Sequence, residues 1–182
     1  MSDITQLLRS ACAGDHQAGD EVVRLLYSDL RRLAAKRLRM SGDLTLDATA
    51  LVHESYLRWQ RAGKLDFPDR RHFLAYAAKV MHSIVIDQVR ARRAERHGGG
   101  YREVTYNTSV ADLPPQRDDE ILRVHEALEE LAAIDLRLAQ VVEMRYFAGL
   151  LESEIAETLG VTERTVQRDW QKARLFLSMA MK

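Results

Sequence analysis

The sequence has few of the residues that interrupt helices or carry redox chemistry. Its 182 residues include three prolines, nine glycines and one cysteine. So few prolines leave most of the chain free to form helices, and the lone Cys12 has no second cysteine for an intrachain disulfide. The sequence contains no run of about 18 apolar residues, no secretion leader and no lipidation motif, so we expect a cytoplasmic protein without a membrane partner.

The sequence also lacks a net charge, because 27 Lys and Arg residues balance 27 Asp and Glu residues. A neutral chain argues against a protein that holds nucleic acid by bulk electrostatics. The charge is unevenly placed, however. Residues 88–102 hold five arginines against Glu95, whereas residues 103–120 hold five acids against Arg117. The charge of individual segments is therefore a better guide to binding partners than the net charge of the chain.

Signatures of catalysis are missing as well. The acids and the six histidines show no metal-ligand spacing, and the chain has no nucleophile and base set and no phosphate-cradling loop. The sequence therefore predicts no catalytic residue, no cofactor and no metal site, and it disfavours an enzyme.

What the sequence does have is helical periodicity in two blocks. Apolar residues recur at helical spacing, without sustained strand alternation, in residues 4–13, 22–38, 51–59, 73–89 and 120–147. Between the blocks lie three successive glycines and the pair Pro114-Pro115, which are typical of a linker. We predict an all-α protein of two small helical domains, residues 1–97 and 119–182, joined by a flexible linker at 98–118.

Residues 152–177 indicate two short helices joined by a tight turn. Gly160 can adopt positive φ, Thr162 can cap the next helix, and that helix is expected to begin at Glu163. Its apolar positions are Val166, Trp170, Ala173 and Leu177. The polar face that remains consists of Arg164, Gln167, Arg168, Gln171 and Lys172. This layout is that of a helix-turn-helix, and the alternative is an ordinary helical hairpin with a solvated charged face.

Several further segments, in this order, resemble one known family. In the first block they are residues 47–59 (DATALVHESYLRW), 73–76 (FLAY) and 84–90 (IVIDQVR). In the second block they are residues 128–135 (LEELAAID), 145–150 (RYFAGL) and 154–156 (EIA), then Thr165-Val166 and Ala173-Arg174. Together they resemble regions 2 and 4 of the extracytoplasmic-function (ECF) group of sigma-70 family factors, over nearly the whole chain.

This resemblance implies a transcription initiation subunit that binds core RNA polymerase and promoter DNA. Region 4 would lie at the polymerase β flap, and region 2 would dock on the β′ clamp helices. Polymerase-binding candidates from the matching helix are Asp47, Leu51, Glu54, Ser55 and Arg58. Glu54 and Arg58 are spaced for an i, i+4 ion pair, whereas core packing is the favoured interpretation for Leu51 and Tyr56.

In the family, the loop before the next helix holds a flipped base of the minus-10 element. Here the segment 64–72 (KLDFPDRRH) supplies stacking, charged and hydrogen-bonding side chains, although it could also be a solvated loop. The following helix offers side chains for phosphate contacts. The minus-10 candidates are Phe67, Asp69, Arg70, Arg71, His72, Lys79, His82, Arg92 and Arg93. Asp87 and Arg90 are expected to form a structural pair.

For the minus-35 element, arginine can pair with guanine and glutamine with adenine in the major groove. We expect Gln167 and Arg168 to read bases, with Arg164 and Lys172 on phosphates.

One departure from the family pattern suggests how the activity of this protein is regulated. Many members carry an acidic pair where this chain has Thr49 and Ala50, and groups lacking that pair are associated with Ser/Thr kinases. We hypothesise that phosphorylation of Thr49, with Thr45 as the other candidate, restores negative charge near a helix N-terminus. The competing interpretation is that Thr49 has no regulatory role and docking rests on apolar contacts. Control by an anti-sigma factor also stays open.

A different class of protein remains as an alternative. The chain could be a stand-alone helix-turn-helix regulator whose N-terminal half serves dimerisation or sensing. A repressor has no need for a base-capturing loop, so the segment 64–72 and the arginines after Asp87 favour the sigma factor.

Overall fold

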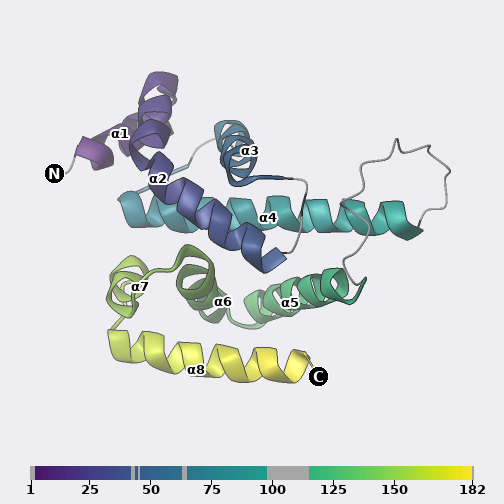
Figure 1. Ribbon diagram of the computed structural model, residues 1–182. Helices are drawn as coiled ribbons and strands as arrows, with labels where there is room; N and C mark the ends of the chain where they lie inside the picture. Colours follow the sequence, from purple (N-terminus) through teal and green to yellow (C-terminus); the bar gives the residue numbers. More distant parts are fainter. Residues whose placement is uncertain (1–2, 42–43, 45, 63–64, 98–114, 182) are drawn as a thin grey trace.

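The computed structural model describes residues 3–41, 44, 46–62, 65–97 and 115–181. Every regular element in these residues is helical, which confirms the predicted all-α fold. Figure 1 shows the long helix α4 between α1–α3 on one side and α5–α8 on the other. In order, the elements are α1 (Asp3–Cys12), α2 (His16–Ser41), α3 (Ala48–Arg61), α4 (Arg70–His97), α5 (Pro115–Ile134), α6 (Leu136–Val142), the π-helix η1 (Glu143–Ala148), α7 (Glu152–Leu159) and α8 (Glu163–Ala180).

Aspartates fix where four of these helices begin, and Asp15 does so for α2. Asp47 accepts a hydrogen bond from the backbone N–H of Ala50 at 2.7 Å, at the start of α3. Asp69 does the same for the first turn of α4, and Asp135 for the first turn of α6. The first backbone N–H groups of a helix have no partner within the helix, and a carboxylate satisfies them.

The helix-turn-helix has the predicted boundaries. Gly160 ends α7 with φ of +65°, a conformation that glycine adopts without steric cost, and Thr162 accepts a hydrogen bond from the Thr165 N–H at 3.2 Å. The second helix then begins at Glu163, as expected. Ile155 and Val166 are fully buried between the two helices, which confirms the apolar face predicted for each.

The predicted linker was too long at its C-terminal end. Helix α5 begins at Pro115, so Pro115 and the three residues after it are helical. Proline is favoured in the first turn of a helix, because its missing N–H has no partner there in any case, and Pro115 was therefore misinterpreted as part of a loop. Asp118, expected in the linker, is 4% exposed. The rest of the predicted linker, residues 98–114, lies outside the described residues.

The two halves of the chain share their hydrophobic packing. Leu122 of α5 belongs to the cluster built mainly from α1–α4, and Ala78 of α4 belongs to the cluster built mainly from α5, α6 and α8. The sequence left open whether the halves pack together, and in this structure they do. The division into domains 1–97 and 119–182 stays a prediction.

Candidate nucleic-acid and polymerase interfaces

The helix α8 presents the predicted minus-35 residues to solvent. Arg164, Gln167, Arg168, Gln171 and Lys172 are all exposed. The opposite face of α8 is held by Val166 and Ala173, which are both fully buried. The exposed polar stripe therefore lies on a helix whose position is fixed by its apolar side, which is what insertion into a groove requires.

One predicted base-reading residue is held by a neighbouring acid. The Gln167 amide donates a hydrogen bond to Glu152 Oε2 at 2.7 Å, and Arg145 pairs with the other oxygen of Glu152. The hydrogen bonds from Gln167 and from Arg145 keep the pKa of Glu152 below its ordinary value, so the carboxylate stays charged. One N–H of the Gln167 amide is therefore already bonded within the chain.

Asp169 was not among the predicted site residues, yet it anchors the recognition helix. Its side chain is 1% exposed and accepts a hydrogen bond from Arg137 Nε at 2.7 Å. This links α8 to the first turn of α6. A signal for this role was present, since Asp169 lies three residues after Val166 and four before Ala173, on the buried face.

The start of α4 is organised by Asp69. Its carboxylate accepts hydrogen bonds from the backbone N–H groups of Arg71 at 2.8 Å and His72 at 3.1 Å, and it lies 3.0 Å from His72 Nδ1. Partial burial raises the pKa of Asp69, but the bonds from His72 and Arg71 outweigh it and the net pKa is lowered. In this arrangement Asp69 and His72 therefore shape the loop as a helix cap.

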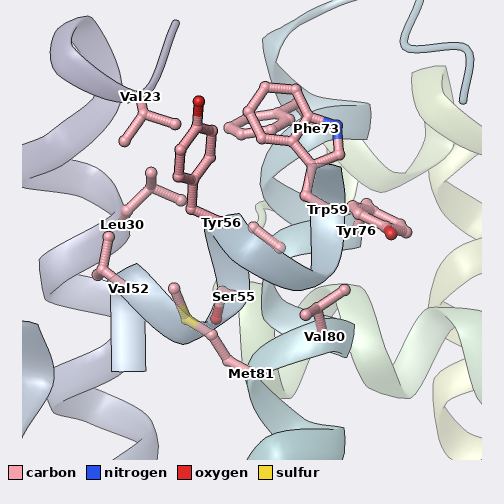
Figure 2. A pocket seen from close by; sticks show the side chains of 11 residues that line it. Val23, Leu30, Val52, Ser55, Tyr56, Trp59, Phe73, Tyr76, Val80 and Met81 are labelled. Atoms are coloured by element: carbon pink, nitrogen blue, oxygen red, sulfur yellow. The ribbon is translucent and has the colours of Figure 1, made fainter. Parts of the chain in front are cut away.

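Phe67 does not occupy the position expected of a base-stacking residue. It is 4% exposed, and its ring centroid lies 5.4 Å from that of Phe73 and 5.2 Å from that of Tyr76. Figure 2 shows Phe73 and Tyr76 beside Trp59, around a cavity of about 20 Å³ between α2, α3 and α4. The ring of Phe67 thus has no exposed face here, because it packs against other aromatic rings between the helices. The spacing of residues in the sequence could not reveal this packing.

The basic side chains predicted for the minus-10 element have partners within the chain. Arg70 pairs with Asp29 of α2 at 2.5 Å. Five others contact groups of the second half: Arg71 pairs with Glu157, Lys79 lies 3.9 Å from Glu143, His82 lies 3.0 Å from His125, Arg92 pairs with Asp118, and Arg93 lies 3.3 Å from Asp119. These basic side chains are therefore engaged by partners within the chain, although Arg70, Lys79 and Arg93 stay about half exposed or more.

Helix α3 buries two of the predicted polymerase-binding residues, and for Leu51 this agrees with the favoured interpretation as a core residue. Leu51 is fully buried, and Ser55 is 7% exposed with its hydroxyl donating to the Leu51 carbonyl at 2.7 Å. Both belong to the core, because they lie on the face of α3 that packs on α2 and α4. Leu57, which was not among the predicted polymerase-binding residues, is instead 43% exposed. Its position two residues after Ser55, on the opposite side of the helix, was the available signal.

The charged residues of α3 remain accessible but pair differently from expectation. Arg58 lies 3.8 Å from Glu54, as the spacing predicts, and it also pairs with Asp87 of α4 at 2.8 Å. The predicted pair between Asp87 and Arg90 is therefore wrong, because the Arg58 guanidinium from the neighbouring helix reaches Asp87. Asp47 caps α3 and is exposed.

Thr49 lies in the first turn of α3 and is partly exposed. No acidic residue lies in that first turn, and Asp47 supplies a negative charge as its N-cap. The other candidate, Thr45, lies outside the described residues.

Two absences can be reported for the described part of the chain. It contains no group of three or more His, Cys, Asp or Glu residues placed to hold a metal ion. Within the same residues, no helix combines the length and the apolar character that crossing a membrane requires.

Comparisons with known proteins bear on identity. The family model described as "ECF sigma factor" matches residues 1–182. The chain is 27% identical over 173 residues to ECF RNA polymerase sigma factor SigK of Mycobacterium ulcerans (strain Agy99), covering 91% of this chain and 86% of the relative. It is 30% identical over 176 residues to ECF RNA polymerase sigma factor SigM of Mycobacterium tuberculosis (strain H37Rv), covering 95% and 82%.

Among solved structures, the chain is similar to the structure of CnrH in complex with the cytosolic domain of CnrY. That similarity has a TM-score of 0.44 at 21% identity and covers 97% of this chain and 96% of the other. ECF sigma factors are transcription initiation factors that bind core RNA polymerase and promoter DNA. With the family model matching its full length, this chain belongs to the ECF sigma factor family.

Proposed function

We propose that this chain directs core RNA polymerase to promoters with two recognition elements, read by separate halves of the molecule. The observation that carries the proposal is the exposed Arg and Gln stripe of α8, held by a buried apolar face behind the turn at Gly160. In this proposal α8 enters the major groove at the minus-35 element, and the half containing α3 and α4 docks on polymerase and holds the minus-10 element.

Within α8, the proposal assigns base reading to Gln167 and Arg168, and phosphate contacts to Arg164 and Lys172. Arg168 is 62% exposed and lies 4.0 Å from Asp169, so its guanidinium is available for a bidentate contact with guanine. Gln167 is exposed, and releasing Glu152 would free both N–H groups of its amide.

The arrangement described above also supports a proposal about the free protein. Basic side chains of α4 and of the loop before it pair with residues of the second half, among them Arg71 with Glu157 and Lys79 with Glu143. These pairs compete with DNA for the same positive charges. We therefore expect the isolated chain to bind promoter DNA weakly and to open when polymerase separates the two halves.

The proposed control point is Thr49. A phosphate there adds about −1.5 to −2 charges in the first turn of α3, where the helix dipole favours anions. Partial exposure of Thr49 and the absence of acids from that turn support this role. The added charge would strengthen docking of α3 on polymerase. The alternative control is a protein partner of the anti-sigma type.

Docking of Thr49 variants on core polymerase tests the switch. We expect Thr49→Glu to bind more tightly than the unmodified chain and Thr49→Ala to bind no more tightly than it. Thr158→Glu, on α7 in the second half, controls for added charge elsewhere on the surface. Equal polymerase affinity for the unmodified chain and for both Thr49 variants would remove Thr49 from the account and leave an anti-sigma partner as the candidate control.

Transcription with core polymerase tests the function itself. We expect promoter-dependent transcripts when the full chain is mixed with core polymerase and genomic DNA fragments. If the chain neither binds core polymerase nor yields transcripts, with Thr49→Glu as well as without it, the promoter-reading proposal fails.

A further inference from the structure

Glu152, the first residue of α7, has a side chain that is anchored on the protein surface. One of its oxygens pairs with Arg145 of η1, and the Arg145 guanidinium carbon lies 4.8 Å from the centre of the Trp170 ring of α8. Trp170 in turn packs against two of the buried hydrophobic clusters. The Glu152 side chain is 28% exposed. Its carboxylate is therefore held, through Arg145, against the proposed recognition helix.

The second oxygen of Glu152 bonds to one of the proposed base-reading residues. Gln167 Nε2 donates to Glu152 Oε2 at 2.7 Å, although the Gln167 residue as a whole is exposed. Trp170 follows Gln167 by three residues, about one helical turn. The same stretch of α8 thus supplies the ring that anchors Arg145 and the amide that Glu152 holds.

A charged carboxylate fixes which end of the Gln167 amide faces it. The hydrogen bonds from Gln167 and Arg145 lower the pKa of Glu152, so at neutral pH this carboxylate can only accept. The amide nitrogen, and not the carbonyl oxygen, must therefore lie on the Glu152 side. Glu152 takes one of the two N–H groups of that nitrogen. One N–H and the carbonyl oxygen remain, which are the donor and the acceptor that a bidentate contact with adenine requires.

The orientation of the amide decides which base it accepts. In the major groove adenine presents an acceptor at N7 and a donor at N6, whereas guanine presents acceptors at both N7 and O6. An amide that rotates freely can turn its nitrogen toward guanine. An amide held on its nitrogen side keeps its carbonyl oxygen in one place, where that oxygen accepts from adenine N6 and repels guanine O6. Holding also removes part of the entropy cost of ordering the side chain on binding.

From these contacts we propose that Glu152 is a positioning residue for promoter recognition, which holds the Gln167 amide so that α8 prefers adenine at one position of the minus-35 element. This inference rests on the proposed function, in which α8 reads that element, and it adds a residue of α7 to the reading surface. Glu152 acts through Gln167, and Arg145 acts one step further back by holding Glu152.

Loss of the Glu152 carboxylate should have opposite effects on affinity and on base preference. Glu152→Ala removes a negative charge beside the DNA, so polymerase carrying it should bind every promoter variant equally well or more tightly. At the position that Gln167 reads, the preference for adenine should fall by about three- to tenfold, because the amide is then ordered only on binding. A role in folding alone would instead weaken binding to all promoter variants together.

Promoter competition with core polymerase carrying the full chain tests the proposal. Gln167→Ala first identifies the position of the upstream element at which the preference for adenine is lost. Promoters that differ only in that base pair then compete for polymerase carrying the wild-type chain, Glu152→Ala or Glu152→Gln. Glu152→Gln keeps the shape of the side chain, but its amide can donate as well as accept and no longer fixes the orientation of Gln167. It should also lose part of the preference, and it keeps the test decisive if Glu152→Ala fails to fold.

Two further variants separate positioning from charge. Glu163→Ala removes an exposed acid from the first turn of α8, and it should leave the preference for adenine unchanged. The double variant Glu152→Ala with Gln167→Ala should lose no more preference at that position than Gln167→Ala alone, because the two residues act as one unit.

Three results would overturn the proposal. The first is a preference for adenine in both Glu152→Ala and Glu152→Gln that equals that of the wild-type chain. The second is a loss of equal size in Glu163→Ala, which would assign the effect to charge. The third is a further loss in the double variant beyond that of Gln167→Ala, which would mean that Glu152 acts independently of Gln167.

Arg168→Ala distinguishes failure of this proposal from failure of the proposed function. If Arg168→Ala relaxes its own position of the upstream element while Glu152→Ala changes no base preference, α8 reads DNA and only the role of Glu152 falls. If neither Arg168→Ala nor Gln167→Ala changes any base preference, the assignment of base reading to α8 falls, and the role of Glu152 falls with it.

Discussion

Adjacent residues in the recognition helix have opposite roles, because a helix turns by about 100° per residue. Arg168 is 62% exposed and is proposed to read a base, whereas Asp169 is 1% exposed and holds Arg137 of α6. The charge of a side chain therefore does not indicate its function here. The face of the helix on which a side chain lies does indicate its function. In the same way, Leu57 and Ser55 lie on opposite faces of α3, so Leu57 is exposed and Ser55 is buried.

The histidine pair between α4 and α5 makes stability sensitive to pH. Burial lowers the pKa of His125 below its ordinary 6.5; the charges of Arg90 and Arg37 act in the same direction, while Glu129 and Glu126 oppose them. The folded state therefore binds fewer protons than the unfolded state between the folded pKa and 6.5. Stability should fall as the pH drops through that window, by at most about 1.4 kcal/mol per pH unit.

Chemical denaturation at pH 7.5 and at lower pH, on the wild-type chain and on His125→Gln, checks this prediction. The variant should lose part of the pH dependence. His53→Gln, which changes an exposed histidine of α3, should keep it. A pH dependence of equal size in His125→Gln and wild type would show that other groups cause it.

At the scale of single elements, local signals predicted boundaries well and long-range contacts poorly. Gly160 and Thr162 set the turn between α7 and α8 through their own backbone and hydroxyl chemistry, so the sequence sufficed. The burial of Phe67 against Tyr76 depends on how α3 and α4 cross. The Arg58 contact with Asp87 joins residues 29 positions apart. Neither follows from spacing along one helix.

The Asp69 cap gives an element-scale prediction. Asp69→Ala should lower the free energy of unfolding by about 1 kcal/mol, because two backbone N–H groups at the start of α4 lose their acceptor. For a chain of this length, that corresponds to a fall in Tm of about 2 to 4 °C. Asp66→Ala removes an exposed acid three residues earlier and should leave Tm nearly unchanged. Equal Tm shifts in the two variants would contradict the capping role.

At the scale of the whole molecule, the neutral net charge corresponds to ion pairs between the two halves. Basic residues of the first half meet acidic residues of the second across their shared boundary. Arg37 contacts Phe147 at a sequence separation of 110 positions, so no local pattern could have predicted that the halves pack together. Opening the molecule would expose a basic surface that the summed charge conceals.

Removing two of these acids should favour DNA binding. The double variant Glu143→Gln and Glu157→Gln takes away the partners of Lys79 and Arg71. Because both pairs are partly exposed, the gain in affinity for a single-stranded minus-10 oligonucleotide should be only about two- to fivefold. Fluorescence anisotropy at fixed salt measures it.

The matched control replaces Glu126 and Glu130 of α5, both exposed, and makes the same change in net charge. We expect little change in DNA affinity from that control. An equal gain in both double variants would mean that net charge, rather than release of the covered surface, governs DNA binding.

The most direct test of the central claim is selection of transcribed sequences from a randomised promoter library by core polymerase carrying this chain. The account predicts two conserved blocks at a fixed separation, and it predicts that Arg168→Ala relaxes one position of the upstream block by about 1 to 3 kcal/mol while the downstream block is unchanged. Selection of a single block, or of an inverted repeat of the kind that a dimeric repressor reads, would contradict it.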